Sequence, residues 1–384
     1  MQPKDGSVRE LDMLDAFDEM ASEYANEFGI PPFNVSHWDS LASFTDRVSV
    51  PLPLSTLPNV LEYQYSYDLT MRSEVVRKLG FPNHEHASLI TPSGTSAIVC
   101  LLNLLRILQI RNVVSTSPVY FPVVHNSDAY GIRLKHYPMN RTEDGFRLAT
   151  PILTDQIPPS DAIWITNPIY SSSVYLTKED LDALERHMYR GGFVIADEAL
   201  AIPGREIART LGHHEKFLGL YTPHKAICVN GVKFGAIVGN KKYQRHLDHW
   251  ADVLIGGIGV SSVIAVEHFL SEQFEAYQQA FLEQMYTARE FVDQLAERLP
   301  HIELDLNASG HFISVYASHL PGDLDLSAIR SLMWTSGASL IPGRRNHFGP
   351  ELPFCWRINL ARDGRPFRAA LGRLMTAVNQ FSLD

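Results

Sequence analysis

The stretch that decides the fold runs from Thr222 to Gly235 and reads TPHKAICVNGVKFG. The first of its two lysines, Lys225, lies in a largely apolar segment between two expected strands. A buried ammonium is costly unless it is paired or neutralised. A lysine whose pKa is lowered by burial becomes a nucleophilic amine that can form a Schiff base with a carbonyl compound. The alternative is a surface lysine with its charged end in water.

The composition is that of an ordinary globular protein. With 384 residues, the chain exceeds the size at which one hydrophobic core stops growing, so we expect a large domain and a smaller one. Its 33 basic and 43 acidic residues give a net charge of -10, which argues against a nucleic-acid partner. We therefore expect a small-molecule partner.

Cysteine usage and hydropathy predict a cytoplasmic location. Cys100, Cys228 and Cys355 are far apart and odd in number, as expected for reduced thiols. The segment Met1–Asp18 is acidic and lacks the basic end and apolar run of a secretion signal. The longest apolar stretch, Val253–Val266, is too short to cross a bilayer. We therefore expect no membrane partner.

Short β-rich runs alternate with helical patterns from Ser88 onward. The expected strands are Leu89–Ile90, Val113–Val114, Arg133–Tyr137, Ala162–Thr166, Phe193–Ala196, Ile227–Val229 and Phe234–Val238. Alternation of this kind predicts an α/β fold with a mostly parallel sheet and helices on both faces.

Both ends of the chain are predominantly helical. Leu11, Leu14, Phe17 and Met20 recur at helical spacing. The C-terminal third predicts a long helix over Glu272–Leu299, a strand over Gly310–Val315, a helix that stops at Gly337 and a last helix from Pro366. We expect three parts: residues 1–62 as an N-terminal helix and arm joining the small domain, 63–270 as the large domain, and 271–384 as a small α+β domain.

Three motifs lie where strands end or helices begin. Ser93-Gly94-Thr95 opens a helix, whose free N–H groups can bind a phosphate, although an ordinary N-cap is the alternative. Tyr120 follows a strand and can stack on a ligand ring or be a core tyrosine. Asp197 ends an apolar strand, where an acid can hold a pyridine nitrogen protonated or simply be solvated.

The order of these motifs, followed by Thr222, Lys225, Gly231, Lys233 and Gly235, resembles the fold type I enzymes that use pyridoxal 5'-phosphate (PLP), the aminotransferase class I/II superfamily. The resemblance extends from about Tyr63 to the C-terminus. It implies catalytic roles for Lys225, which would carry PLP as a Schiff base, and for Asp197. The implied cofactor-binding residues are Ser93, Gly94, Thr95, Tyr120, Asn167, Tyr170, Asp197, Thr222, Lys225 and Lys233.

The chain departs from the family pattern at several positions. Tyr170 stands where an asparagine usually donates to the phenolic oxygen of PLP, so either Tyr170 or Asn167 would serve that oxygen. Leu200 stands where the family often has a tyrosine beside the same oxygen. Lys233 replaces an arginine that grips the phosphate, which keeps the charge but loses the planar fork. His224 is either a structural histidine or a proton relay.

The substrate side of the resemblance rests on Arg357. It lies in the strand-like run Phe354–Leu360 and would bind the α-carboxylate of an amino acid through two parallel hydrogen bonds. Arg344, Arg345 and Arg362 are the alternatives. The resemblance also implies a homodimer, in which one of Tyr63, Tyr65 and Tyr67 reaches the partner's phosphate. The histidine pairs have no accompanying carboxylates at a recognised spacing, so we expect no metal site.

The expected reaction is transamination between an amino acid and a 2-oxo acid. Related scaffolds also support elimination, cyclisation, decarboxylation and oxidation, so a specialised PLP enzyme that does not transaminate is the alternative. A ligand-binding homologue without turnover is a third interpretation, against which the presence of Lys225 and Asp197 argues.

Overall fold

The computed structural model describes residues 10–39, 72–81, 86–142, 145–305, 307–343 and 352–382. Tyr63, Tyr65, Tyr67, Arg344 and Arg345 lie outside the described residues.

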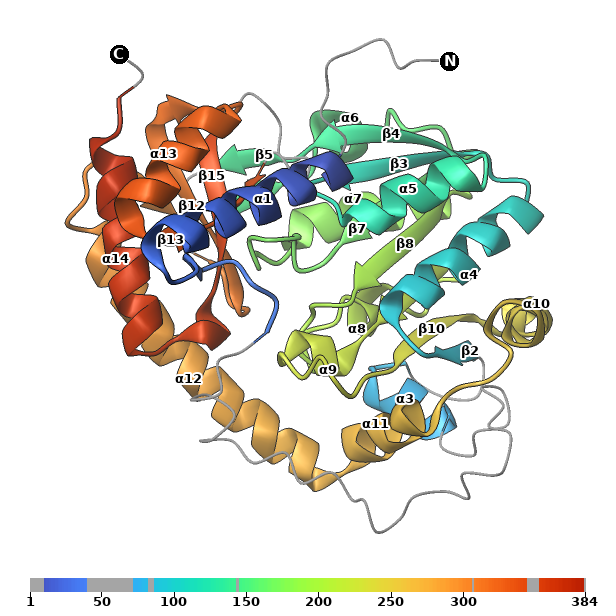
Figure 1. Ribbon diagram of the computed structural model, residues 1–384. Helices are drawn as coiled ribbons and strands as arrows, with labels where there is room; N and C mark the ends of the chain where they lie inside the picture. The colour runs from blue at the N-terminus through green and yellow to red at the C-terminus, as the bar shows by residue number, and fades with distance from the viewer. Residues whose placement is uncertain are drawn as a thin grey trace.

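A seven-stranded sheet forms the centre of the larger part of the molecule (Figure 1). Its order is β2 (His86–Thr91), β10 (Gly235–Asn240), β9 (Phe217–Tyr221), β8 (Phe193–Glu198), β7 (Ala162–Thr166), β3 (Asn112–Ser117) and β4 (Arg133–Pro138). β10 is antiparallel to both of its neighbours, and the pairs from β9 to β4 are parallel. Every residue of β7, β8 and β9 is buried, as expected for strands covered on both faces. The predicted mostly parallel α/β fold is confirmed.

Alternate side chains of these strands belong to two different hydrophobic clusters. Trp164, Ile195 and Leu218 pack in one cluster with residues of α4 (Gly94–Ile107), α5 (Phe121–Ala129) and α10 (Gln244–Trp250). Ile163, Val194 and Phe217 pack in the other with residues of α3 (Arg72–Lys78), α7 (Lys178–Tyr189), α8 (Ala208–Leu211) and α11 (Val260–Leu270). Because successive side chains of a strand point to opposite faces, this division places helices on both faces of the sheet.

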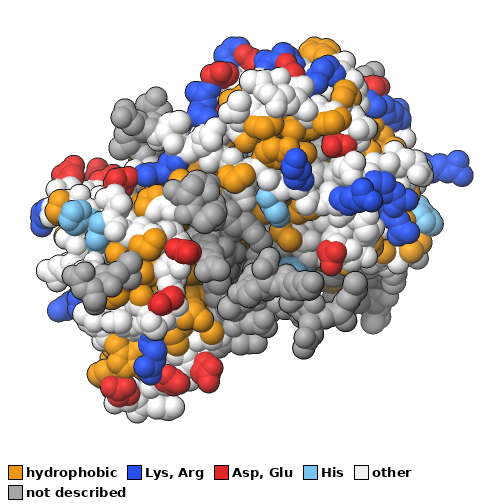
Figure 2. Space-filling view, turned by 90° about the horizontal axis from the view of Figure 1, so that it is seen from above, with side chains coloured by type: hydrophobic (Ala, Val, Ile, Leu, Met, Phe, Trp, Pro, Cys, Tyr) orange, Lys and Arg blue, Asp and Glu red, His pale blue; other side chains and the backbone are white. Residues whose placement is uncertain are grey.

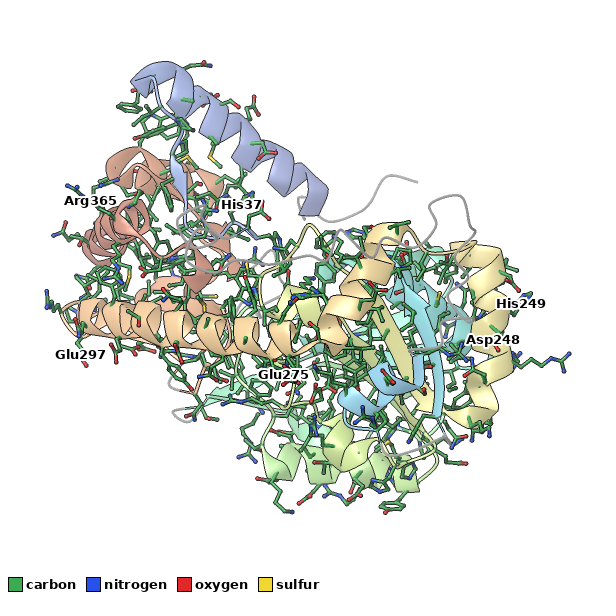
Figure 3. All side chains as sticks on the ribbon, turned by 90° about the horizontal axis from the view of Figure 1, so that it is seen from below. His37, Asp248, His249, Glu275, Glu297 and Arg365 are labelled. Atoms are coloured by element: carbon green, nitrogen blue, oxygen red, sulfur yellow. The ribbon has the colours of Figure 1, made fainter. Side chains whose placement is uncertain are left out.

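The C-terminal part is built on a smaller antiparallel sheet. Its order is β11 (Ile302–Leu304), β12 (Phe312–Pro321), β15 (Pro353–Asn359) and β14 (Ile341–Pro342). The 25-residue helix α12 (Glu272–Ala296) crosses from the large sheet to this part, as the positions of Glu275 and Glu297 show in Figure 3. α13 (Leu326–Ser336) and α14 (Arg365–Gln380) pack against each other.

The N-terminal helix joins the C-terminal part. α1 (Glu10–Phe28) places Tyr24 with its ring centroid 5.4 Å from that of Trp334 on α13, and Glu23 accepts a hydrogen bond from Arg330. β1 (Phe33–Asn34) then pairs in parallel with β13 (Ala338–Ser339). The segment that follows β1 contacts the large part of the molecule, because the backbone oxygen of Trp38 accepts a hydrogen bond from Asn230. The remaining short elements are β5 (Asn140–Thr142), β6 (Gly145–Arg147), α6 (Thr150–Leu153) and α9 (Pro223–Ala226).

The strand predicted over Ile227–Val229 is wrong. Lys225 lies on the short helix α9, and the chain then turns through Cys228, whose φ of 60° is left-handed and incompatible with a strand. Ile227 is nevertheless fully buried, which explains why the run looked like a strand. Among the described residues, no helix has both the length and the apolar character needed to cross a membrane.

Candidate active site

A cavity of about 240 Å³ lies at the carboxyl edge of the large sheet. Strands β2, β3, β8 and β9 end here, and ligands of open α/β sheets bind at this edge. Its lining residues are Trp38, Asp39, Ser93, Gly94, Thr95, Ile98, Tyr120, Asp197, Ala199, Leu220, Thr222, Lys225, Asn230 and Lys233. The cavity thus brings together eight residues that the sequence predicted for the site: Ser93, Gly94, Thr95, Tyr120, Asp197, Thr222, Lys225 and Lys233.

Lys225 projects from α9 into the cavity, where it is partly buried between two aromatic rings. Its Nζ lies 4.4 Å from the ring centroid of Tyr120 and 4.6 Å from that of Trp38. Desolvation lowers the pKa of Lys225 to about 8; Asp197 opposes this shift, and the positive charges of Arg357 and Lys233 add to it. A lowered pKa makes the neutral, nucleophilic amine accessible near physiological pH.

Asp197 is the last residue but one of β8 and is only 2% exposed. Its Oδ1 accepts a hydrogen bond from the backbone N–H of Ala199 at 3.1 Å. Burial raises the pKa of Asp197 to about 6, and the charge of Lys225 opposes this rise. At pH 7 the site therefore holds a carboxylate and an ammonium together.

The other end of the cavity is made by the start of α4. Ser93 caps this helix, and its Oγ accepts from the N–H of Ser96 at 3.2 Å. A Cβ on Gly94 would lie 2.9 Å from Cγ2 of Thr222, and one on Gly235 would lie 2.5 Å from Oγ1 of Thr91. Only glycine fits these two approaches. Free N–H groups, hydroxyls and the exposed cation of Lys233 suit a phosphate.

Tyr120 connects the two ends. Burial raises the pKa of Tyr120 to about 12 and the side chain of Thr95 opposes this rise, so the phenol stays neutral. Its ring faces the cavity beside Lys225. The donor set as a whole fits a small molecule with a phosphate at one end, a flat ring, and a basic nitrogen that a buried carboxylate can hold.

Arg357 lies behind this cavity on β15 and is 1% exposed. Its guanidinium donates to the hydroxyl of Tyr170 at 3.3 Å and to the backbone oxygen of Ser36 at 3.0 Å. It also lies 4.4 Å from the ring centroid of Trp38 and 4.3 Å from that of Phe312. Arg357 and Tyr170 are not among the described residues that line the cavity.

Asn167 is directed elsewhere. Its amide donates to Oε1 of Glu198 at 3.0 Å, and its oxygen accepts from the N–H of Leu176 at 3.2 Å. Asn167 is fully buried and is not part of the described cavity lining. In this structure its side chain holds the end of β8 to the neighbouring loop.

His224 also faces away from the cavity. Its Nε2 lies 3.0 Å from Nδ1 of His268, and its ring packs against Phe234 and Phe274. Burial lowers the pKa of His224 to about 3, so the ring is neutral. These contacts favour a structural histidine over a proton relay.

Trp38 and Asn230 are site residues that the sequence did not reveal. Asn230 donates to the backbone oxygen of Trp38 at 3.1 Å, so the two belong to one assembly. Trp38 comes from the segment after β1, far from every recognised motif in the sequence, and no local pattern marks it. The described residues contain no group of three or more His, Cys, Asp or Glu side chains arranged to hold a metal ion.

Comparison with known proteins agrees with this architecture. Histidinol-phosphate aminotransferase 1 of Bacillus cereus is 23% identical over 191 residues, and the match spans 48% of this chain and 50% of that protein. Among solved structures, alanine aminotransferase from Pyrococcus furiosus superposes with a TM-score of 0.79 at 14% identity, covering 98% of both chains. Escherichia coli YbdL, described as having a methionine aminotransferase function, gives 0.78 at 16% identity, covering 98% of this chain and 100% of YbdL. At such identities the structural likeness shows the fold alone.

The family is shown by the sequence itself. The family model described as aminotransferase class I and II matches residues 53–366, which include the Ser93 loop, Asp197, Lys225 and Arg357. The chain belongs to the aminotransferase class I and II family.

Proposed function

We propose that this protein is a PLP-dependent aminotransferase that moves an α-amino group from an amino acid to a 2-oxo acid. The observation that carries the proposal is the convergence of Lys225, Asp197 and the Ser93 loop on one cavity at the carboxyl edge of the sheet. The family uses PLP, and the donor set of the cavity suits that cofactor.

The cofactor roles follow from the chemistry of each side chain. Lys225 would form the covalent link, Asp197 would hold the pyridine nitrogen protonated, and Tyr120 would stack on the ring. The phosphate would be bound by Ser93, Gly94, Thr95, Thr222 and Lys233. When bound, PLP supplies an electron sink for the bonds at the substrate Cα.

Lys225 would also carry the proton at the substrate Cα. An amine with a pKa of about 8 can accept and return a proton near neutral pH, which suits general acid–base catalysis. Asp197 faces Lys225 and is ionised at pH 7, because its pKa is about 6.

Arg357 would bind the α-carboxylate of the substrate. Its hydrogen bond to Tyr170 supports a role for Tyr170 in orienting the guanidinium. Tyr170 is also the better candidate for the phenolic oxygen of PLP, because its ring lies 5.5 Å from that of Tyr120, whereas the amide of Asn167 is bonded to Glu198.

The proposal includes a cytoplasmic homodimer that binds small molecules and neither nucleic acid nor membrane. Val253 and Leu254 are 59% and 40% exposed, and apolar side chains of this size on a surface favour a protein partner. The three cysteines are buried free thiols, which suits a reducing compartment. On the face in Figure 2, basic and acidic side chains are interspersed, unlike a nucleic-acid surface.

The test is to load the purified protein with PLP, supply a panel of amino acids with a 2-oxo acid, and quantify both products. Lys225→Ala should abolish amino transfer. Among the described residues, the other lysine that lines the cavity is Lys233, and it lies at the phosphate end. Lys178→Ala, at an exposed helix position, is the matched control and should transfer normally. Release of ammonia or carbon dioxide, or consumption of oxygen, without a new amino acid would contradict transamination. Light scattering should give the mass of two chains.

A further inference from the structure

The indole of Trp38 contacts both cations that the proposed reaction requires. Its ring centroid lies 4.6 Å from Nζ of Lys225 and 4.4 Å from Cζ of Arg357. An amino acid acted on by Lys225 and held by Arg357 must lie beside the same two groups. The indole therefore takes up space that a substrate needs.

The cavity volume leads to the same conclusion. Trp38 lines the cavity, whereas Arg357, whose Cζ lies 4.4 Å from the indole centroid, does not. The volume of about 240 Å³ is below the ~300–1,000 Å³ of small-molecule sites. It suits the cofactor alone.

The surroundings of the indole are apolar and aromatic. Its ring centroid lies 4.7 Å from that of Phe312 and 6.3 Å from those of Tyr120 and Tyr170. Leu200 packs in the same cluster. A ligand that displaces the indole can make the same apolar and aromatic contacts only if it carries a flat or large apolar group.

The backbone beneath Trp38 is held in place. Four successive carbonyl oxygens, from Ser36 to Asp39, each accept a side-chain hydrogen bond. The donors are Arg357 to Ser36 at 3.0 Å, Asn359 to His37 at 2.8 Å, Asn230 to Trp38 at 3.1 Å and Arg362 to Asp39 at 3.0 Å. The indole can therefore leave by rotation of its own side chain while the backbone stays.

We infer that Trp38 determines substrate specificity: its indole occupies the place of the substrate side chain, rotates out when substrate binds, and selects amino acids with aromatic or other large apolar side chains. This inference rests on the proposed function. An internal occupant reduces the fraction of protein ready to bind, so the apparent affinity for a ligand falls by that fraction.

The test measures binding of 3-phenylpropionate and indole-3-propionate to the PLP-loaded protein by calorimetry, with propionate as the small comparison ligand. Trp38→Ala should bind both aryl carboxylates about tenfold more tightly than the wild type, because the competing ring is gone. The affinity of Trp38→Phe for these ligands should lie between those of Trp38→Ala and the wild type. His37→Ala is the control: its side chain, labelled in Figure 3, is exposed, its polar contacts among the described residues are with Asp39, and its backbone bond to Asn359 remains.

Weaker or unchanged aryl-carboxylate binding by Trp38→Ala would overturn the inference, because an indole that forms a wall for the substrate adds affinity. In the wild type, kcat/KM should be higher for aromatic amino acids than for alanine, and the reverse order would also overturn it. Amino transfer by the same wild-type preparation tests the proposed function separately. Thermal melting shows whether Trp38→Ala is folded. If Trp38→Ala does not fold, the comparison is made with Trp38→Phe, which keeps an aromatic ring at this position.

Discussion

Two acids adjacent in the sequence have different roles because a strand alternates its side chains. Asp197 faces Lys225, whereas Glu198 points to the opposite side, towards Asn167 and the backbone N–H of Ile207. Burial raises the pKa of Glu198 to about 8, and hydrogen bonds from the backbone of Ile207 and from Asn167 oppose this rise, whereas the charge of Lys225 opposes the rise for Asp197. Glu198 is therefore a neutral acid at pH 7, outside the cavity.

Replacing Glu198 with Gln should change how stability depends on pH. The pKa of Glu198 is about 8 in the folded protein and near 4.5 when unfolded, so the folded state binds more protons between these values. The contribution of protonated Glu198 to the free energy of unfolding is fully present below about pH 4.5 and is lost as pH rises through about 8. Gln mimics the neutral acid. We expect Glu198→Gln to match the wild type within about 1 kcal/mol at pH 5 and to exceed it by a few kcal/mol, on the order of 3, at pH 9.

Urea unfolding at several pH values measures this difference. Glu297→Gln, at the exposed end of α12 (Figure 3), is the control and should follow the wild type throughout. Parallel stability curves for Glu198→Gln and the wild type would show that Glu198 is ionised at neutral pH and refute the assignment.

At the scale of elements, the start of β10 is packed against the turn that begins α4. A Cβ on Gly235 would lie 2.5 Å from Oγ1 of Thr91 and 2.7 Å from the backbone oxygen of Ser93. The backbone atom cannot rotate away, so the Ser93 turn itself must move. The spacing of β10 from this turn thus controls the phosphate end of the cavity.

Gly235→Ala should therefore weaken both the fold and the cofactor site. We expect a loss of about 1–3 kcal/mol in unfolding free energy, as for other overpacked positions. The dissociation constant of PLP should rise about tenfold or more, because each tenfold change needs only about 1.4 kcal/mol. Equilibrium dialysis and urea unfolding measure the two effects.

Gly231→Ala, four residues earlier in the loop that leads into β10, provides a matched control. A Cβ there meets no atom within 4 Å, so we expect a change of less than about 0.5 kcal/mol and normal PLP binding. Equal behaviour of the two variants would mean that the Ser93 turn is not set by its contact with β10.

A structural feature could be predicted from the sequence where neighbouring residues determine it, and could not where distant residues do. The positions of the Ser93 loop, Asp197 and Lys225 were predictable because each lies at the end of an apolar strand or within a few residues after one. Asn167 was predictable as a strand-end residue, but the direction of its amide depends on Glu198, 31 residues away. Trp38 was not predictable, since Asn230, Asn359 and Arg357 hold its segment from nearly 200 residues or more away.

At the scale of the whole molecule, an arginine on the β5–β6 hairpin joins the larger part of the molecule to the smaller sheet. Arg141, on the hairpin after β4, donates to Asp305 at 3.1 Å and to Glu303 at 2.8 Å. Its guanidinium lies 3.7 Å from the ring centroid of Tyr316, whose hydroxyl donates to Asp305 at 2.9 Å. Tyr316 is on β12, which pairs with the strand that carries Arg357. This joint therefore helps to position β15, and with it Arg357, relative to Lys225, together with the bond from Ser314 of β12 to the backbone oxygen of Ser171.

Arg141→Ala should affect the substrate side of the site more than the cofactor side. Asp305 is buried, and burial already raises its pKa, so removing its cation should cost about 3 kcal/mol. We expect the KM for the amino acid to rise severalfold, since Arg357 loses its placement, whereas PLP affinity should stay within about twofold because its residues lie on the other sheet. The control is Arg330→Ala, which removes an exposed ion pair and should cost less than about 1 kcal/mol. If PLP affinity and KM change together, the two sheets do not position cofactor and substrate independently.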